Sequence, residues 1–378
     1  MKVWYIKLKR NIIPIAFLLF TICLIIFSKS NIVAVKNSLN IWANNVIPSL
    51  LPFFIATELL NNTNIPKIIG NLFNKIMRPL FNVPGIGAYA LFMGIISGYP
   101  VGAKIVTNFR NNNQCTKEEA ERLITFTNNS GPLFILGTVG ITLFYDTYIG
   151  LLLLSTHILA SICVGIIFRF WKINKSKKRN TNTLETNIYF NSLGEVLSKS
   201  ILSAINSVVL IGGFIVLFGI ILSILQKTYV LNFLKILFVP FFNSLNINVD
   251  FIIPILTGIL ELTNGVTAVS CIANKNLAVN VIICAFLLGF GGISIMLQVL
   301  SITSKSDISI KPYILGKFLH GIIASAITLG IVSLSKTECV FSQNARPMSV
   351  SFLATTLFLL IGISIIFVLT RKAYHSKE

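Results

Sequence analysis

Long apolar stretches separated by short polar loops run through nearly the whole chain. A helix needs about 20 apolar residues to cross the hydrocarbon core of a bilayer. Stretches that approach or exceed this length predict spanning helices over 12–27, 32–60, 117–144, 148–171, 196–225, 278–300 and 312–334, with one more near the C-terminal end. This pattern is typical of an all-α polytopic membrane protein with about eight transmembrane spans.

The segment 66–82 has a different pattern, because apolar residues recur along one side of it only. The apolar stripe contains Ile68, Ile69, Leu72, Phe73, Ile76, Met77 and Leu80. The opposite side carries Lys67, Asn71, Asn74, Lys75 and Arg78. Such a helix is expected to lie in the plane of the membrane interface, where it suggests a protein that forms a homo-oligomer.

The second half of the chain repeats the first at offsets of 160 to 164 residues. ANNVIPSLLPFFIATELL (43–60) aligns with INSVVLIGGFIVLFGIIL (205–222), and His157 falls opposite His320. GIISGYPVGAKI, which starts at Gly94, aligns with GILELTNGVTAV. Several matches in one order at nearly one offset indicate a duplicated unit.

The duplication predicts five segments. A first span and its cytoplasmic end (1–31) precede a first repeat (32–171), a basic cytoplasmic loop (172–193) and a second repeat (194–334). A final span with a cytoplasmic C-terminus follows (335–378). The N-terminal end resembles a signal peptide, but no small-residue cleavage site follows it, so we expect it to be retained as a span.

The distribution of lysine and arginine indicates how the segment 84–109 sits in the membrane, since cytoplasmic loops carry an excess of these residues. A crossing at 84–109 would leave the most basic loop (172–179) outside. A re-entrant hairpin instead places 24 of the 31 basic residues inside and inverts the second copy. We therefore predict two inverted repeats with re-entrant hairpins at 84–109 and 250–273, an arrangement typical of secondary transporters.

Composition removes several other classes of protein. Only 11% of the residues are charged, against roughly 25% in soluble domains. The net charge of +19 comes from residues spread over short loops, so we expect them to set topology and not to bind nucleic acid. Six cysteines lie singly, which indicates neither a metal site nor disulfides. The sequence lacks catalytic motifs, so we expect a protein that is not an enzyme and needs no cofactor. It also lacks a nucleotide-binding loop, so we expect ion or substrate gradients to drive transport.

Four interruptions of the apolar stretches supply the candidate binding residues. They lie at 97–100, 128–132, 261–265 and 289–292. Irregular backbone at membrane depth is tolerated where it lines protein or a water-filled cavity, and the start of a half-helix attracts anions. We therefore predict a site for a small polar molecule. Its candidate residues are Ser97, Gly98, Tyr99, Lys104, Asn128, Asn129, Ser130, Glu261, Thr263, Asn264 and Gly291.

Structural alternatives exist for three of these features. The glycines of GFGG (289–292) can serve close helix packing alone, and NNSGP (128–132) can be a simple kink. Lys104 can snorkel to the cytoplasmic face instead of contacting substrate.

Titratable residues inside the apolar stretches are the other candidates. Glu261 is an intramembrane carboxylate, so we expect it to serve substrate, proton or sodium coupling. Glu58 fits that role less well because it lies near a helix end. His157 and His320 are expected to pack helices rather than to relay protons.

The strings SGYPVGAK (97–104) and TNNSGP (127–132) carry a family resemblance. The chain resembles the YlbJ/SpoVV-type sporulation integral membrane proteins, which contain the nucleoside-recognition Gate domain, and the similarity covers most of its length. That family is similar in layout to concentrative nucleoside transporters, which move substrate by an elevator-like shift. The resemblance implies transport of dipicolinic acid across the outer forespore membrane of a sporulating bacterium.

The residues are compatible with a flat dianion of this kind. Half-helix starts, Lys104, amides and the ring of Tyr99 suit it, whereas Glu261 would repel it unless protonated or ion-paired. Two other functions stay open: a nucleoside or nucleobase permease, and a non-transporting membrane scaffold needed for spore formation. The sequence leaves the coupling ion, a proton or sodium, undetermined.

Overall fold

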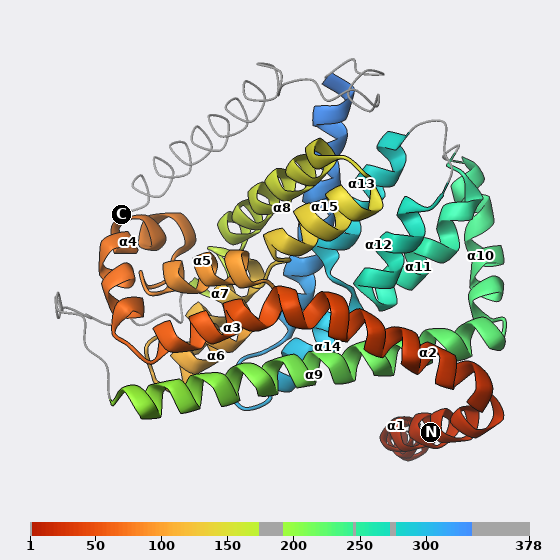
Figure 1. Ribbon diagram of the computed structural model, residues 1–378, viewed down its shortest axis with the longest axis horizontal. Helices are drawn as coiled ribbons and strands as arrows, with labels where there is room; N and C mark the ends of the chain where they lie inside the picture. The colour runs from red at the N-terminus through yellow and green to blue at the C-terminus, as the bar shows by residue number, and fades with distance from the viewer. Residues whose placement is uncertain (1, 174–191, 245–246, 273–276, 335–378) are drawn as a thin grey trace.

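The computed structural model describes residues 2–173, 192–244, 247–272 and 277–334, and this part of the chain is helical without strands (Figure 1). The helices of the first half are α1 (Lys2–Ile26), α2 (Ser28–Ile41), η1 (Trp42–Val46), α3 (Ile47–Asn61), α4 (Ile65–Phe81), α5 (Gly87–Ser97), α6 (Val101–Asn111), α7 (Lys117–Thr127), η2 (Leu133–Leu143) and α8 (Thr147–Phe168). Those of the second half are α9 (Leu193–Lys227), α10 (Val230–Ser244), η4 (Val249–Phe251), α11 (Ile252–Leu260), α12 (Leu262–Ser270), α13 (Leu277–Phe290), α14 (Gly292–Thr303) and α15 (Lys311–Leu334).

Helices follow one another in the same order in the two halves. Each half has a long first helix, a shorter second one, two short helices joined at a tip, two more that meet at an interruption, and a closing helix. The two long helices, α2–α3 and α9, lie side by side (Figure 1). Ser38 packs on Gly219, and Asn62 donates a hydrogen bond to Ser200 at 3.2 Å. The numbering rises in one helix as it falls in the other, so the two run antiparallel.

Five helices of the described chain are long and apolar enough to cross a membrane. They are Ser28–Asn61, Thr147–Phe168, Leu193–Lys227, Leu277–Thr303 and Lys311–Leu334. Each coincides with a predicted span. The protein is therefore an all-helical polytopic membrane protein, as the hydrophobic pattern predicts.

The other three predicted spans have different outcomes. The apolar part of α1, Asn11–Ile26, is a shorter helix. The stretch 117–144 is divided into α7 and η2 by residues 128–132, where the sequence predicted an interruption. The predicted final span and most of the basic loop at 172–193 lie outside the described residues.

Both predicted hairpin segments turn back on themselves. A Cβ atom added to Gly94 in α5 would lie 3.4 Å from the Cα of Gly102 in α6. A Cβ atom added to Gly265 in α12 would lie 2.0 Å from the Cα of Gly258 in α11. Residues seven or eight positions apart in a straight helix are about 10–12 Å apart. Neither segment is therefore a single straight helix, and each pair of helices crosses through glycines beside its tip.

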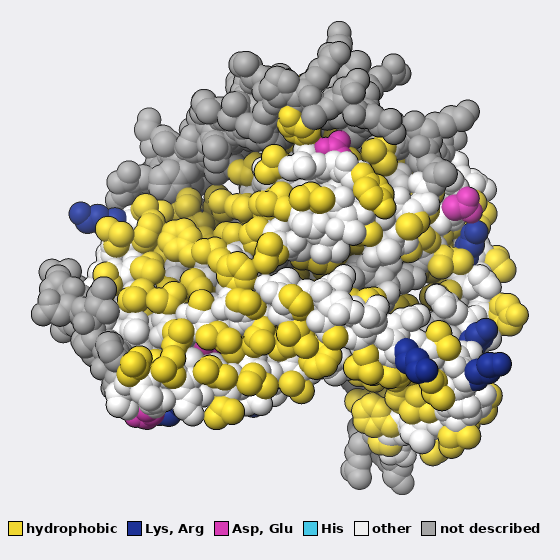
Figure 2. All heavy atoms as spheres, in the orientation of Figure 1, with side chains coloured by type: hydrophobic (Ala, Val, Ile, Leu, Met, Phe, Trp, Pro, Cys, Tyr) yellow, Lys and Arg dark blue, Asp and Glu magenta, His cyan; other side chains and the backbone are white. Residues whose placement is uncertain are grey.

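Apolar side chains cover much of the visible surface (Figure 2). On α10, Phe233 is 63% exposed and Ile236 is 68% exposed. The apolar stripe of α4 is divided between two environments: Met77 is buried in the core, whereas Leu72 is 72% exposed. An exposed apolar surface of this extent suits contact with lipid.

Candidate functional site

The first two interruptions meet at a glycine contact. Gly98, at the tip between α5 and α6, has a φ of 78°, which favours glycine. A Cβ atom on Gly98 would lie 2.8 Å from the amide nitrogen of Gly131, in the break between α7 and η2. Gly102 likewise lies close to Thr127, because a Cβ atom on Gly102 would lie 2.1 Å from the Thr127 carbonyl oxygen. The first hairpin tip therefore lies directly against the second interruption.

The break between α13 and α14 connects this pair to the second hairpin. Gly291 and Gly292 have φ angles of 82° and 80°. A Cβ atom on Gly291 would lie 3.2 Å from the hydroxyl oxygen of Tyr99 in the first tip. One on Gly292 would lie 3.1 Å from the carbonyl oxygen of Gly258 and 3.3 Å from the amide nitrogen of Leu262, at the second tip. All four interruptions are therefore contiguous; we call this region the break junction.

A lysine from the closing helix α15 reaches into the break junction. Lys317 is fully buried. Its Nζ donates to the hydroxyl of Tyr99 at 3.0 Å, to the carbonyl oxygen of Asn128 at 3.3 Å and to Nδ1 of His320 at 3.1 Å. The Tyr99 hydroxyl itself donates to the carbonyl of Leu288 at 3.0 Å, so its oxygen is free to accept. Three acceptors around one nitrogen match the three donors of an ammonium ion.

Two histidines extend this hydrogen-bond network, and their contacts determine which ring nitrogen donates and which accepts. His320 Nε2 lies 2.9 Å from the carbonyl oxygen of His157, so this nitrogen carries the proton and Nδ1 is left to accept from Lys317. His157 Nε2 accepts from the backbone N–H of Ser130 at 3.1 Å. The two rings lie 4.4 Å apart. Both side chains are buried, and the network joins α8, α15 and the α7–η2 break.

Asn128 links the same elements through its side chain. Its Nδ2 donates to the hydroxyl of Tyr313 at 2.9 Å, and its Oδ1 accepts from the backbone N–H of Ala103 at 3.4 Å. The neighbouring Asn129 donates to the carbonyl of Phe126 at 2.8 Å. Asn128 therefore holds the first hairpin and α15 to the second interruption.

Three buried polar atoms near the junction lack a hydrogen-bond partner in the structure. They are the Oδ1 of Asn129, the Oγ1 of Thr127 and the Nδ1 of His157. Buried polar atoms are almost always hydrogen-bonded. A polar ligand at the junction would find unused donors and acceptors at these positions.

Glu261 belongs to the second hairpin tip and is 5% exposed. Its carboxylate accepts from the backbone N–H of Thr263 at 3.1 Å and from that of Asn264 at 2.8 Å. It therefore caps the start of α12, and these two predicted site residues hold it through their backbone amides. Ser97 lies on the first hairpin, where its hydroxyl is 2.9 Å from that of Thr57.

Lys104 lies apart from the break junction. Its Nζ pairs with the carboxylate of Glu58 at 2.7 Å and donates to the hydroxyls of Ser203 and Ser207, both at 2.8 Å. It is thus an ion-paired residue between α3, α6 and α9. Its ammonium group is held by these side chains and not by a side chain of the four interruptions, and the Lys104 side chain is 23% exposed.

Sequence reasoning did not select Lys317, because it looked for carboxylates inside the apolar stretches. One signal was present: Lys317 and His320 are three positions apart in an apolar helix, which places them on one face. The sequence predicted that the two histidines pack helices, and that prediction did not include the contact between His320 and Lys317. In the described part of the chain, no group of three His, Cys, Asp or Glu residues is arranged to hold a metal ion.

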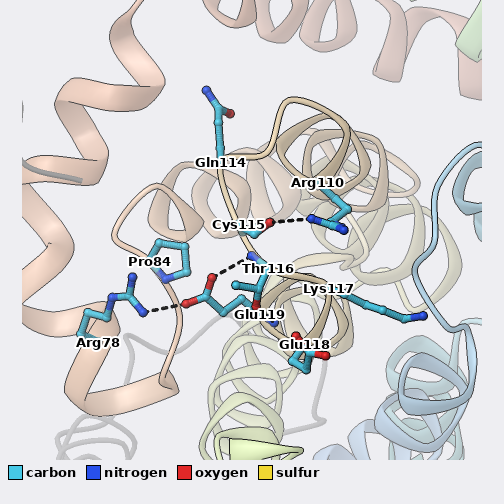
Figure 3. Close-up of a pocket in the computed structure, with 9 residues that line it drawn as sticks. All are labelled: Arg78, Pro84, Arg110, Gln114, Cys115, Thr116, Lys117, Glu118 and Glu119. Carbon is cyan, nitrogen blue, oxygen red and sulfur yellow. Dashed lines mark hydrogen bonds and ion pairs between the residues drawn. The ribbon is translucent and has the colours of Figure 1, made fainter. Parts of the chain in front are cut away.

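A cavity of about 310 Å³ lies away from the junction, between α4 and the loop that joins α6 to α7 (Figure 3). Arg78 pairs there with Glu119 at 2.7 Å. Glu119 also caps α7, because Oε2 accepts from the backbone N–H of Thr116 at 2.9 Å. Burial raises the pKa of the neighbouring Cys115 thiol to about 12. The cationic Arg78 side chain is thus already paired within the protein.

Comparisons with known proteins add two findings. Residues 43–170 match the model of the Gate family, described as nucleoside recognition. The chain is also similar to the sporulation integral membrane protein YlbJ of Bacillus subtilis (strain 168), with 35% identity over 376 residues, which covers 92% of this chain and 90% of the relative. No solved structure matches the chain.

Proposed function

Because the chain belongs to the family of the sporulation integral membrane protein YlbJ, we propose that it is a carrier that moves a small heterocyclic anion during spore formation. The substrate proposed is dipicolinate, and the membrane is the outer forespore membrane. Family membership supports a membrane protein of sporulation. The choice of dipicolinate is what the resemblance to the YlbJ/SpoVV-type proteins implies, and the chemistry of the break junction supports an anion.

The observation that carries the proposal is the buried side-chain nitrogen of Lys317, which would be an ammonium group when protonated. Its three hydrogen-bond partners are all neutral, and no carboxylate within the described residues forms an ion pair with it. A buried charge without a counter-ion is unfavourable. An anionic substrate would supply the missing charge.

Helix starts add to the positive potential of the junction. Four helices begin directly after the four breaks: α6 at Val101, η2 at Leu133, α12 at Leu262 and α14 at Gly292. The start of a helix carries partial positive charge. Glu261 already caps α12, which leaves three starts for a dianion with two carboxylates.

The proposed mechanism is an elevator-type movement of two inverted repeats in an eight-span protein. The antiparallel α2–α3 and α9, and the same helix order in both halves, support inversion. The glycine crossings in the two hairpins support a re-entrant form for each of them. The junction is closed around Lys317, so its exposure to either side requires the hairpins to move.

Flux through purified protein tests the proposal. Proteoliposomes that contain the wild-type protein should take up labelled dipicolinate, and Lys317→Met should reduce the uptake by about tenfold or more, since hydrogen bonds to charged groups contribute roughly 1.5–3 kcal/mol. Lys305→Met, on the exposed loop after α14, is the matched control and should transport normally. Absence of wild-type uptake would refute the function, provided that the protein elutes as a single folded species.

A nucleoside or nucleobase permease is the second candidate, favoured by the nucleoside-recognition description of the Gate family. This function predicts uptake of labelled nucleoside that unlabelled dipicolinate does not inhibit. The carrier proposed above predicts the reverse pattern of competition in the same vesicles.

A further inference from the structure

We propose that the Lys317–His320 pair is the coupling site of the carrier, and that it takes up one proton with each substrate anion. This inference rests on the proposed function, because it concerns the same junction. The pair is the shortest contact between two basic side chains in the network, at 3.1 Å from Nζ to Nδ1.

The first argument is the charge balance of the site. Lys317 carries three donors toward three acceptors when it is protonated. With an anion beside it, the ammonium group is neutralised. After the anion leaves, the same ammonium group is a buried charge without a counter-ion, which is strongly unfavourable. Loss of the proton removes that charge, so the proton and the anion are expected to bind and leave together.

The second argument is that the structure gives the proton a partner on the same helix. Because His320 Nε2 donates to the carbonyl of His157, its Nδ1 faces Lys317 with a lone pair. A proton on Lys317 can therefore pass to His320 Nδ1 and from there to water on the side to which the junction opens, while the other ring nitrogen keeps its hydrogen bond. No bond other than N–H changes in this step.

Few other titratable groups face the pair. They are the hydroxyl of Tyr99 from the first hairpin tip, the hydroxyl of Tyr313 from α15, which reaches the site through Asn128, and the ring of His157 from α8. The α7–η2 break presents the carbonyl and amide of Asn128, and the α13–α14 break presents the carbonyl of Leu288 and the glycines. Among these groups, Lys317 and His320 are the two basic side chains in direct hydrogen-bond contact with each other.

Glu261 is less suited to coupling. Both of its carboxylate oxygens accept backbone N–H groups that start α12. Protonation of Glu261 would weaken that cap, whereas protonation of Lys317 completes its hydrogen bonds.

Two variants separate coupling from a general loss of transport. His320→Asn places an amide oxygen near the position of Nδ1, so it can still accept from Lys317 but cannot take up a proton at neutral pH. Lys305→Met, on the exposed loop after α14, is the control, because it removes a basic side chain that lies outside the break junction.

The test uses purified full-length protein in proteoliposomes with labelled dipicolinate outside, a pH-sensitive dye inside and the membrane potential clamped at zero. One proton per anion predicts about tenfold accumulation for each pH unit of inward gradient, since one unit is a tenfold ratio of proton concentration. The dye should report acidification when dipicolinate is added. His320→Asn should still bind dipicolinate but lose the accumulation, whereas Lys305→Met should keep it.

Each other result counts against a specific claim. Wild-type vesicles without dipicolinate flux under any gradient would overturn the proposed function and this inference with it. Flux without a response to pH, or flux that follows a sodium gradient, would overturn the proton coupling alone. Accumulation by folded His320→Asn would overturn the role of His320. If that variant does not fold, the dye signal of the wild-type protein still decides whether protons accompany the anion.

Discussion

Lys104 and Lys317 are lysines of similar sequence context in very different environments. Each is a cation within a largely apolar segment of the chain. Lys104 pairs with Glu58 and two serines, whereas Lys317 meets three neutral acceptors. The first charge is balanced by the protein itself, so its role is to hold helices together. The second charge is available to a ligand.

Removal of one partner of the Lys104–Glu58 pair should destabilise the protein. Lys104→Met leaves the Glu58 carboxylate, which is 11% exposed, without its cation. We expect the free energy of unfolding to fall by about 2 kcal/mol, less than for a fully buried pair because Lys104 is partly exposed. The double variant Lys104→Met/Glu58→Gln should recover much of this loss, as thermal unfolding in detergent would measure.

The control for this measurement is the exposed pair between Lys199 and Glu195. Lys199→Met should change the unfolding midpoint little, because exposed ion pairs contribute little. If Lys104→Met and the double variant Lys104→Met/Glu58→Gln had equal stability, the structural role given to this pair would be contradicted.

At the scale of elements, glycines allow the hairpins and the broken helices to approach closely. Gly94 and Gly102 cross near the first tip, and Gly258 and Gly265 cross near the second. Both Gly94 and Gly102 also face the carbonyl of Thr127. The packing of the interruptions therefore depends on residues without side chains, a common device in membrane helix contacts.

A methyl group at this contact should destabilise the junction. In Gly102→Ala, the new Cβ atom would meet the Thr127 carbonyl oxygen at 2.1 Å and its carbon at 2.6 Å. Both are backbone atoms, so the hairpin itself must shift. We expect a loss of about 1–3 kcal/mol, as for other overpacked sites, measured as a lower midpoint of thermal unfolding.

Gly330→Ala in α15 is the matched control, because no atom lies within 4 Å of the added Cβ position. Alanine has the higher helix propensity, so this variant should be neutral or slightly stabilising. A Gly102→Ala protein as stable as the Gly330→Ala protein would show that the hairpin contact is looser than described.

At the scale of the whole molecule, polar contacts join the two halves at one end of the bundle. Arg110, at the end of α6, donates to both carboxylate oxygens of Asp307, in the loop between α14 and α15, at 2.8 and 2.9 Å. Glu121 of α7 accepts from the backbone N–H of Ser309 in the same loop at 3.4 Å. These bonds hold the first hairpin and α7 to the second half away from the break junction.

This connection predicts a dependence of stability on pH. Hydrogen bonds from Arg110 hold the pKa of Asp307 below its ordinary value. A carboxyl group with a lowered pKa in the folded protein stabilises it above the ordinary pKa of about 3.9, and the contribution disappears as the pH falls through the lowered value. Asp307 is largely exposed, so the effect is expected to be below about 1 kcal/mol.

Asp307→Asn is the variant that isolates this contribution. The difference in unfolding midpoint between it and the wild-type protein should be small at neutral pH and should vanish in strong acid. A difference that grows as the pH falls would contradict the direction of the shift.

The sequence by itself determined the helical class, five of the long spanning helices and the position of each interruption. These properties are local, since they depend on the length of apolar runs and on glycine, proline and asparagine within them. The sequence also placed Tyr99, Asn128 and Gly291 in the breaks.

The tertiary structure alone decided which side chains face those breaks. Lys317 and His320 lie in an uninterrupted helix, and nothing in the local pattern of α15 states that this face turns toward Tyr99 and Asn128. The partner of Lys104 was equally hidden, because Glu58 lies on another helix. Contacts between helices depend on how each helix is rotated and crossed, and packing of the whole bundle sets both.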